Sequence, residues 1–352
     1  MKTTTSKWRY TGYLIGLLIT VTLCPSGCHY KRQSIERIMQ NEMQCEMAVQ
    51  MAWGDGINDL GYVSDGEPSI HAYLPLRFQV DSVGHIYVTD PLNERVMELS
   101  AKGELITSFV VPLSKDLEFI KDVAIGGNQV VVATTDHIYT FDQEGDFLQI
   151  LKWPAGVGNY GLCSEDMAGR KVQVDERGNI YACGLGGFER GGTIIQFDAR
   201  GNSRVFYVGA FNHFIVGQDG FIYITQLSDT ERANIPPDER VLQFDPRGAQ
   251  LGEIIISGED LANAGLVSPG LLVAVDAKGY LYGDVVNAIE DGEIVSFNAL
   301  VQINKDGKIL RIIERDKFIR PATDVVDGAG NLYIWNFGRA PSEPAEIWRC
   351  HF

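Results

Sequence analysis

The chain has 352 residues, 45% of them hydrophobic, and a formal net charge of −16 at pH 7. This length and hydrophobic content are enough for a large buried core, and a single repeat domain can run to this size. A chain this acidic repels phosphate backbones and anionic membrane surfaces, so the composition argues against a nucleic-acid partner.

Residues 1–27 have the features of an export signal. Three basic residues precede an apolar stretch from Tyr13 to Leu23, which matches the charged region and short hydrophobic core of a secretory signal. This stretch is about eleven residues long, too short to span a bilayer comfortably. We therefore predict that residues 1–27 are a signal peptide.

The end of this signal, Ser26-Gly27-Cys28, resembles the end of a bacterial lipobox, in which small residues precede the lipidated cysteine. The resemblance implies lipidation at Cys28 and a lipoprotein of the bacterial cell envelope, either periplasmic or at the cell surface. Pro25 stands where the lipobox has Leu, so cleavage with release and an uncleaved anchor remain alternatives. Residues 28–44 are then a tether, and the membrane is contacted only through the anchor.

From residue 45 onward a short pattern recurs six times: an apolar run, a turn that in the clearest copies reads Asp-x-x-Gly, and an Ile/Leu-Tyr strand. The copies begin at Val80, Ile125, Val174, Val216, Val275 and Val326. Between Gly84 and Gly330 the interval averages about 49 residues, the length of a propeller blade.

Each repeat also has a second half, in which an apolar run ends in another tight turn. Examples are Phe141–Gly145, Ile195–Gly201 and Leu242–Gly248. One repeat therefore has four short antiparallel strands rich in Val, Ile and Tyr and bounded by Gly and Asp turns. We predict an all-β fold, a six-bladed β-propeller over residues 45–352 with four antiparallel strands per blade.

The tyrosines of the repeats share one register. They are Tyr87, Tyr181, Tyr223, Tyr282 and Tyr333. A residue placed identically in every repeat serves the repeat, so we interpret these tyrosines as packing between blades rather than as a ring of binding residues.

The segment from Asp81 to Val96 resembles the NHL-repeat family of propellers. Tyr87-Val88-Thr89-Asp90 is followed there by Asn93-Glu94-Arg95-Val96. The resemblance implies that Asp90, Asn93 and Arg95 hold the loop after the second strand. It covers roughly residues 45 to 352, and more distantly the chain is similar to the gluconolactonase-like propeller superfamily.

The last repeat contains only three strands, so the ring needs one more strand to close. The segment Glu46–Gly54 reads as a strand, and we predict that it pairs with Glu346–Phe352 and leaves no open sheet edge. Cys45 then lies near Cys350, because the start of one antiparallel strand faces the end of the other. We predict a Cys45–Cys350 disulfide.

Cys163 and Cys183 are predicted to form a second disulfide. The first of them precedes the third blade and the other ends that blade's second strand. Exported chains with paired cysteines form disulfides. Buried free thiols are the alternative for all four cysteines of the propeller.

Sequence signatures of catalysis are missing: the chain has no Gly-x-Ser-x-Gly, His-Glu-x-x-His, phosphate-loop or Cys-x-x-Cys motif. His85 and His137 stand at strand starts and are interpreted as surface or packing residues. Asp in the turns is explained by bonds from backbone N–H groups, and the turns lack the further oxygen ligands of a calcium loop. We expect no catalytic residue, metal or cofactor, and a protein that is not an enzyme.

Long loops gather on one face, because connections between second and third strands emerge beside the blade-to-blade connections. They include Gly184–Gly192, Gln226–Arg240, Asp284–Asn298 and Asn336–Ala345. Variable loops usually carry function on a repeat scaffold. The candidate ligand-face residues are Asp90, Arg95, Glu189, Arg190, Glu231, Arg232, Asp284, Glu290, Asp291, Asn336 and Arg339. A solvated rim of mixed charge is the alternative.

Two functions remain open at this point. The first is a monomeric, non-catalytic binding propeller that recognises a protein, peptide or glycan through the long-loop face. The second is a metal-dependent hydrolase of the gluconolactonase type, for which the resemblance implies metal ligands among Asp284, Asn336, Asp90 and Glu67. The Glu-Gly-Pro motif of that family is not matched, since this chain has Gly66-Glu67-Pro68.

Overall fold

The computed structural model covers the part of the chain that begins at residue 44. It describes residues 44–54, 56–61, 77–114, 118–152, 172–184, 192–209, 211, 213–217, 220–226, 238–266, 272–290, 293–315, 321–327, 329–336 and 343–351. The predicted signal peptide, Cys28 and the tether up to residue 43 lie outside these residues. Within them, no helix is long and apolar enough to cross a membrane.

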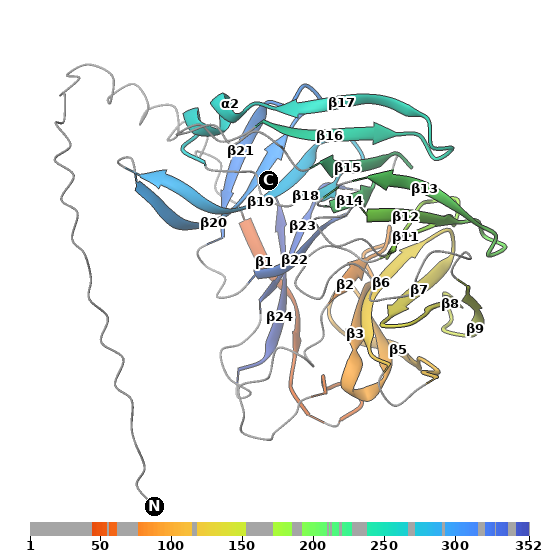
Figure 1. Ribbon diagram of the computed structural model, residues 1–352. Helices are drawn as coiled ribbons and strands as arrows, with labels where there is room; N and C mark the ends of the chain where they lie inside the picture. The colour runs from red at the N-terminus through yellow and green to blue at the C-terminus, as the bar shows by residue number, and fades with distance from the viewer. Residues whose placement is uncertain are drawn as a thin grey trace, which may run out of the picture.

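Six antiparallel sheets of four strands each form a six-bladed β-propeller, as predicted (Figure 1). Blade 1 consists of β2 (Phe78–Val80), β3 (Ile86–Asp90), β4 (Arg95–Leu99) and β5 (Leu105–Val110), and blade 2 of β6 (Ile120–Gly126), β7 (Gln129–Thr134), β8 (Ile138–Asp142) and β9 (Phe147–Leu151). Blade 3 consists of β10 (Val172–Val174), β11 (Ile180–Gly184), β12 (Gly192–Phe197) and β13 (Ser203–Gly209), and blade 4 of β14 (His213–Val216), β15 (Ile222–Gln226), β16 (Glu239–Phe244) and β17 (Gln250–Ile256). Blade 5 consists of β18 (Leu272–Val275), β19 (Leu281–Glu290), β20 (Glu293–Ile303) and β21 (Ile309–Glu314), and blade 6 of β22 (Pro321–Val326), β23 (Leu332–Asn336), β24 (Ala345–His351) and β1 (Gln44–Met51).

The core lies between neighbouring blades. Every residue of β3 and of β7 is buried, which explains why these strands are apolar at consecutive positions rather than alternating. The five repeated tyrosines are at most 2% exposed, and Tyr87 of blade 1 packs against Val130 and Val132 of blade 2. The prediction that they pack between blades is confirmed.

The turn between the first and second strands is held by its aspartate. In blade 3, Asp175 Oδ1 accepts the backbone N–H of Arg177 at 3.0 Å and of Asn179 at 2.8 Å. Gly178 in this turn has φ +80°, a conformation that glycine adopts without steric cost. Asp81, Asp276 and Asp327 accept the same pair of backbone bonds. The structural explanation of the Asp-x-x-Gly pattern therefore holds.

The ring closes between the two ends of the chain. β1 pairs antiparallel with β24, with Cys45 opposite Cys350 in the register, and the two cysteines form a disulfide with a Cα–Cα distance of 4.1 Å. The closing strand begins at Gln44 rather than at Glu46 as predicted, since Gln44 still pairs with His351. Cys183 is 1% exposed and also disulfide-bonded; its predicted partner Cys163 lies outside the described residues.

One predicted loop is wrong. Asp284–Asn298 was expected to be a long loop, but β19 and β20 continue pairing through it as far as Glu290 opposite Glu293. Figure 1 shows this hairpin projecting from the ring. The reason lies in the sequence, where Asp291-Gly292 between β-branched runs is a strong two-residue hairpin signal.

A short helix lies in the connection between blades 4 and 5. α2 (Gly258–Asn263) follows Ser257, whose side chain accepts hydrogen bonds from the backbone N–H groups of Glu259 and Asp260. Serine at this position satisfies N–H groups that have no partner inside the helix. The helix lies on the long-loop side, between the last strand of blade 4 and the first of blade 5.

We expect the closing disulfide to be a large contributor to stability. The bond joins residues 305 positions apart, and on the chain-entropy model such a loop contributes on the order of 5 kcal/mol. The double variant Cys45→Ser/Cys350→Ser should lower the free energy of unfolding in urea by an amount of this order. An unchanged urea midpoint would contradict the prediction, and a linked Cys45–Cys350 peptide in a non-reduced digest is the direct check.

Candidate functional site

A cavity of about 640 Å³ lies in the centre of the ring. All six innermost strands line it, through Val80, Ile125, Val174, Val216, Val275 and Val326. Residues of the first-to-second-strand turns also line it, among them Asp81, Gly127, Glu176 and Gly217. The cavity is therefore at the tight-turn end of the channel, opposite the face that carries the predicted long loops.

The cavity wall combines an apolar collar with hydrogen-bonding groups. Gln173 joins two blades, since its Nε2 donates to Phe214 O at 2.8 Å and its Oε1 accepts from Val216 N at 2.7 Å. Gln79 lines the same cavity from blade 1. The described lining contains the carboxylates of Asp81, Glu98 and Glu176 and no Lys or Arg, so its field disfavours anions.

A histidine–glutamate pair lies in the wall of the cavity. His85 Nδ1 is 2.8 Å from Glu98 Oε1 and 3.8 Å from Asp81 Oδ2. Glu98 is 6% exposed, whereas the His85 side chain is 36% exposed. Burial, together with the nearby carboxylates of Glu98 and Asp81, raises the pKa of Tyr87, so this phenol stays protonated and hydrogen-bonds to Glu98.

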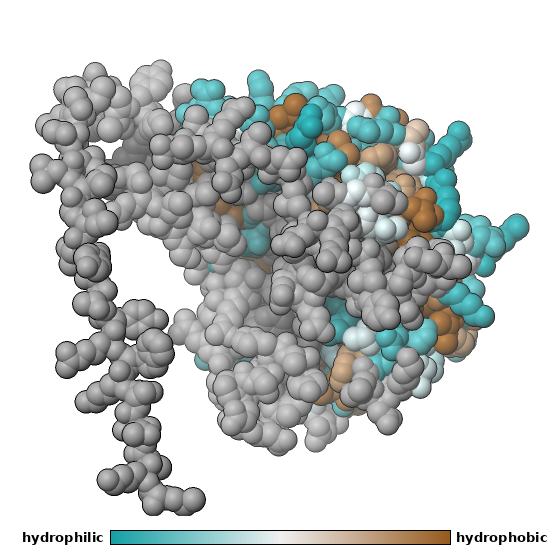
Figure 2. All heavy atoms as spheres, viewed as in Figure 1, coloured by the Kyte–Doolittle hydropathy of each residue, from teal (hydrophilic) through white to brown (hydrophobic). Residues whose placement is uncertain are grey.

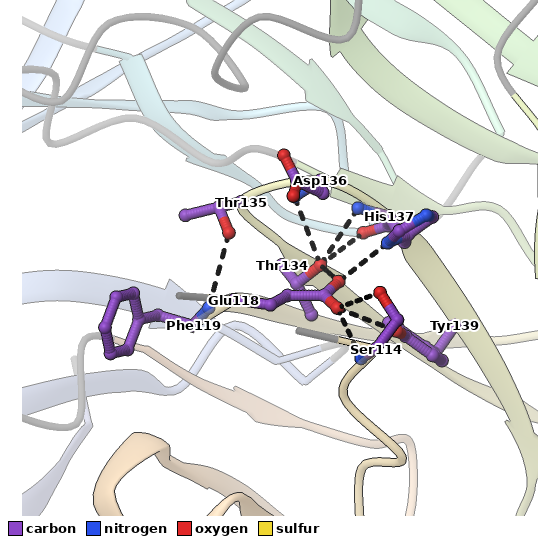
Figure 3. A network of polar contacts seen from close by, with 8 residues as sticks. All are labelled: Ser114, Glu118, Phe119, Thr134, Thr135, Asp136, His137 and Tyr139. Carbon is purple, nitrogen blue, oxygen red and sulfur yellow. Dashed lines mark hydrogen bonds and ion pairs between the residues drawn. The ribbon is translucent and has the colours of Figure 1, made fainter. Parts of the chain in front are cut away.

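A second such pair lies in blade 2, at the other end of the propeller (Figure 3). His137 Nδ1 is 2.9 Å from Glu118 Oε1, and Thr134 donates its hydroxyl to the same oxygen. Glu118 Oε2 accepts the backbone N–H of Ser114 at 2.8 Å, its hydroxyl at 2.9 Å, and the Tyr139 hydroxyl at 3.1 Å. Glu118 precedes β6 and His137 precedes β8, which places this network on the long-loop side.

The hydrogen bonds decide the charge of Glu118, which is 2% exposed. Burial acts to raise the pKa of this carboxyl, but the bonds from Thr134, Ser114 and His137 outweigh it and lower the pKa to about 2 from 4.5. A carboxylate that accepts this many donors is stabilised in its charged form. We interpret the Glu118 network as structural, because every carboxylate lone pair is used within the protein.

The first two ligand-face candidates belong to a structural clip. Asp90 is fully buried and accepts from Gly61 N at 3.0 Å, Asn93 Nδ2 at 2.7 Å and Arg95 Nε at 2.8 Å. Arg95 also donates to the carbonyls of Ile57, Gly56 and Asp59. These contacts hold the segment 56–61 against blade 1, in the role that the NHL resemblance implies.

Asp284 and Asn336 are also engaged within the protein. Asp284 forms an ion pair with Arg315, which is 2% exposed, and Asn336 Nδ2 donates to Glu346 Oε2 at 3.0 Å. Their partners come from their own blades, so neither side chain is poised to hold a ligand alone.

The remaining ligand-face candidates are Glu189, Arg190, Glu231, Arg232, Asp291 and Arg339, which lie outside the described residues, and Glu290, whose side chain lies outside them. The described residues therefore do not include enough of the predicted ligand face to form one continuous surface.

The structure describes three of the four metal ligands that the gluconolactonase resemblance implies. Asp90 pairs with Arg95, Asp284 pairs with Arg315, and Asn336 donates its Nδ2 to Glu346, while Glu67 lies outside the described residues. Among the residues that the structure describes, no three His, Cys, Asp or Glu side chains are grouped to hold a metal.

No protein-family model matches the sequence, and no curated protein sequence matches it. Solved structures share the fold. A gluconolactonase from Xanthomonas campestris aligns with a TM-score of 0.51 and 12% identity over 90% of this chain and 91% of its own. Virginiamycin B lyase from Staphylococcus aureus aligns with a TM-score of 0.49 and 10% identity over 88% and 100%, and the calcium-binding protein regucalcin from Agrobacterium tumefaciens with 0.47 and 14% over 79% and 90%.

These comparisons correct one prediction. The absence of catalytic motifs led us to expect that the chain is not an enzyme, and this is contradicted because a similar solved structure is a gluconolactonase. The sequence motifs are not a sound test in this fold, since a propeller builds a site from residues on separate blades. At this identity the likeness shows the fold alone.

Sequence reasoning did not anticipate the cavity at the tight-turn end. It interpreted His85 as a surface or packing residue, yet His85 lines the cavity. The missed signal is a departure from the repeat: blade 1 has His85 and Glu98 where blade 3 has Asn179 and Gln196. Aligning the repeats position by position would have found it.

We expect Glu118 to make the fold sensitive to acid. Its pKa is lowered from 4.5 to about 2, so its contribution is complete above pH 4.5 and is lost as the pH falls towards 2. The contribution is about 3 kcal/mol. The free energy of unfolding in urea should fall between about pH 5 and about pH 2 in both proteins. The fall should be larger in wild type than in Glu118→Gln by about 3 kcal/mol.

The matched control for this experiment is Glu104→Gln, which removes an exposed carboxylate from the turn between β4 and β5. This variant should follow wild type over the whole pH range. If Glu118→Gln follows wild type as well, the network does not hold the carboxylate in its charged form.

Proposed function

We propose that this chain is an exported, lipid-anchored propeller of the bacterial cell envelope that binds a small organic molecule in its central cavity. The observation that carries the proposal is the cavity of about 640 Å³ at the tight-turn end of the ring. Its size falls within the range of small-molecule sites.

The walls define the chemical class of the ligand. Valines from five innermost strands and Ile125 offer apolar contact on all sides. Polar groups come from the Gln79 and Gln173 amides, from His85 and Glu98, and from residues of the tight turns. Because the described lining holds three carboxylates and no Lys or Arg, a neutral or positively charged ligand is favoured over an anion.

The described chain enters the ring at the same end as the cavity. Gln44 pairs with His351, and β24 reaches His351 at the tight-turn end after starting from the long-loop side. In a protein anchored at Cys28, a fully extended tether would span about 50 Å between the lipid and this end of the ring.

Recognition of a protein, peptide or glycan through the long-loop face stays a prediction from the sequence. Its described candidates, Asp90, Arg95, Asp284 and Asn336, all bond within the protein. The cavity is therefore the better-supported site.

The cavity predicts a charge preference that a matched series of small molecules can measure. Benzamide, benzylamine and benzoate have the same ring and differ in charge. We expect the first two to bind with dissociation constants on the order of 1 mM, and benzoate at least about tenfold more weakly. Isothermal calorimetry or ligand-observed NMR measures all three.

Two substitutions test whether these molecules bind in the cavity. Val174→Phe should fill the cavity and remove the binding, whereas Val205→Phe, on the exposed face of β13, should leave it unchanged. Binding that survives Val174→Phe, or that favours benzoate, would show that the cavity is not the site.

Lipidation is tested by metabolic labelling with a fatty acid. The label should be lost in Cys28→Ser and retained in Cys24→Ser, because only Cys28 follows the small residues Ser26-Gly27. Labelling that persists in Cys28→Ser rejects the anchor.

A further inference from the structure

The two histidine–glutamate pairs of the propeller differ in their surroundings. His137 and Glu118 belong to the closed network at the long-loop end, where all carboxylate bonds are made within the protein. His85 and Glu98 line the cavity. The Glu118 carboxylate therefore spends its bonds within a closed network, whereas the His85–Glu98 pair lines a ligand-sized space.

The cavity pair places two titratable groups where the other blades do not. The residue opposite the repeated tyrosine is Gln196 in blade 3, Gln243 in blade 4, Gln302 in blade 5 and Arg349 in blade 6, whereas in blade 1 it is Glu98. The residue two positions before the tyrosine varies, being Asn179 in blade 3, Phe221 in blade 4, Tyr280 in blade 5 and Asn331 in blade 6, and in blade 1 it is His85.

Packing does not require this departure. In blade 3, Gln196 Nε2 donates to Tyr181 OH at 2.7 Å, and Asn179 Nδ2 donates to Asp175 Oδ2 at 2.7 Å. Gln302 bonds Tyr282 OH in the same way, at 2.7 Å. Asparagine and glutamine thus satisfy the tyrosine and the turn, so a titratable pair at these positions in blade 1 needs an explanation other than folding.

The geometry points to His85 as a general base for proton transfer in neutral carbonyl compounds, with Glu98 as its positioning residue. This proposal rests on the cavity being the ligand site. Nδ1 lies 2.8 Å from Glu98 and 3.8 Å from Asp81, so in the neutral imidazole Nδ1–H donates to Glu98 and the lone pair of Nε2 is free to accept a proton. No group in the described part of the chain bonds to Nε2.

Isomerisation of a β,γ-unsaturated ketone is a reaction that the His85–Glu98 pair can catalyse without a co-reactant. Nε2 takes a proton from the carbon between the carbonyl and the double bond. The electron pair of the broken C–H bond moves into the carbonyl and forms a dienolate. The same proton is then returned to the far end of the dienolate, and the double bond shifts into conjugation. No atom is gained or lost, and no oxidant, reductant or water is consumed.

Other groups of the cavity suit this chemistry. Gln79 lies opposite Tyr87 in the strand register and lines the same cavity, so its side-chain amide is a donor for the developing enolate oxygen. The buried Glu98 carboxylate stabilises the imidazolium that forms when Nε2 takes the proton. The valine collar accepts the hydrocarbon part of the substrate.

The probe is 3-cyclohexen-1-one, whose conversion to 2-cyclohexen-1-one is followed by the absorbance of the conjugated product. We expect His85→Asn to lower kcat/KM by about 100-fold or more, the usual contribution of a general base. Glu98→Gln should lower kcat by at least about tenfold and change KM less than about twofold, because Glu98 acts through His85 on the proton transfer. Both variants place in blade 1 the residue types that blade 3 carries, so both are expected to fold.

The matched control is His137→Asn, the same substitution in the other pair. It should change kcat/KM by less than about twofold. Added imidazole should restore part of the activity of His85→Ala and none of that of Val174→Phe, which has no space for it. Conversion that falls equally in His85→Asn and His137→Asn, or that does not exceed the buffer rate in wild type, overturns the proposal.

Benzamide binding is measured on the same samples to separate the two proposals. Wild type that binds benzamide and does not isomerise the ketone refutes the role of His85 and leaves the cavity as a binding site. Wild type that binds neither compound refutes the cavity itself. Folding of each variant is checked by its thermal unfolding midpoint.

Discussion

Closure of the ring is the constraint on which the rest of the structure depends. A propeller blade buries both faces of its inner strands against its neighbours, so a gap at one seam would expose the core of two blades. Here the seam is closed by pairing β1 with β24, and the Cys45–Cys350 disulfide links the same two strands. Arg349 and Glu46 form an ion pair across it. The cavity exists because all six blades are held at one common radius.

Within the closed ring, a polar cluster fixes the inner hairpin of blades 1, 3, 5 and 6. An aspartate accepts the backbone N–H groups of its own turn, and in blades 3 and 5 the tyrosine of the second strand bonds to that aspartate and to a glutamine of the third. The cluster lies beside the cavity in these blades. Substitutions at its outer positions change the chemistry of the cavity without changing the fold, as blade 1 illustrates with His85 and Glu98.

The sequence was sufficient for the architecture because the repeat carries its own register. The spacing of the turns predicted six blades, and the missing strand of the last repeat predicted the pairing of both chain ends. The extended β19–β20 hairpin was missed because the residues between the two repeated strands were interpreted as a loop. The β-branched runs on both sides of Asp291-Gly292 indicate strands instead.

The candidate site was harder to predict for a physical reason. Asp284 and Asn336 are ligand-type residues by composition, but each has a partner, Arg315 and Glu346, that only the folded blade brings near. The cavity, conversely, is lined by valines and turn residues that look unremarkable along the chain. Its character comes from six short strands meeting at one axis, a relation that no local stretch of sequence contains.

The position of the seam has a consequence for how the protein is made. The closing strand β1 precedes blade 1 and its partner β24 belongs to blade 6, so the ribosome must synthesise all six blades before β1 can pair with its neighbour. A chain cut short before β24 would carry β1 and β23 as unpaired edges, which invite pairing with other chains. A chain that lacks β24 is therefore expected to aggregate or to be degraded. In a chain that contains β24, this strand pairs with both β1 and β23 and covers both edges.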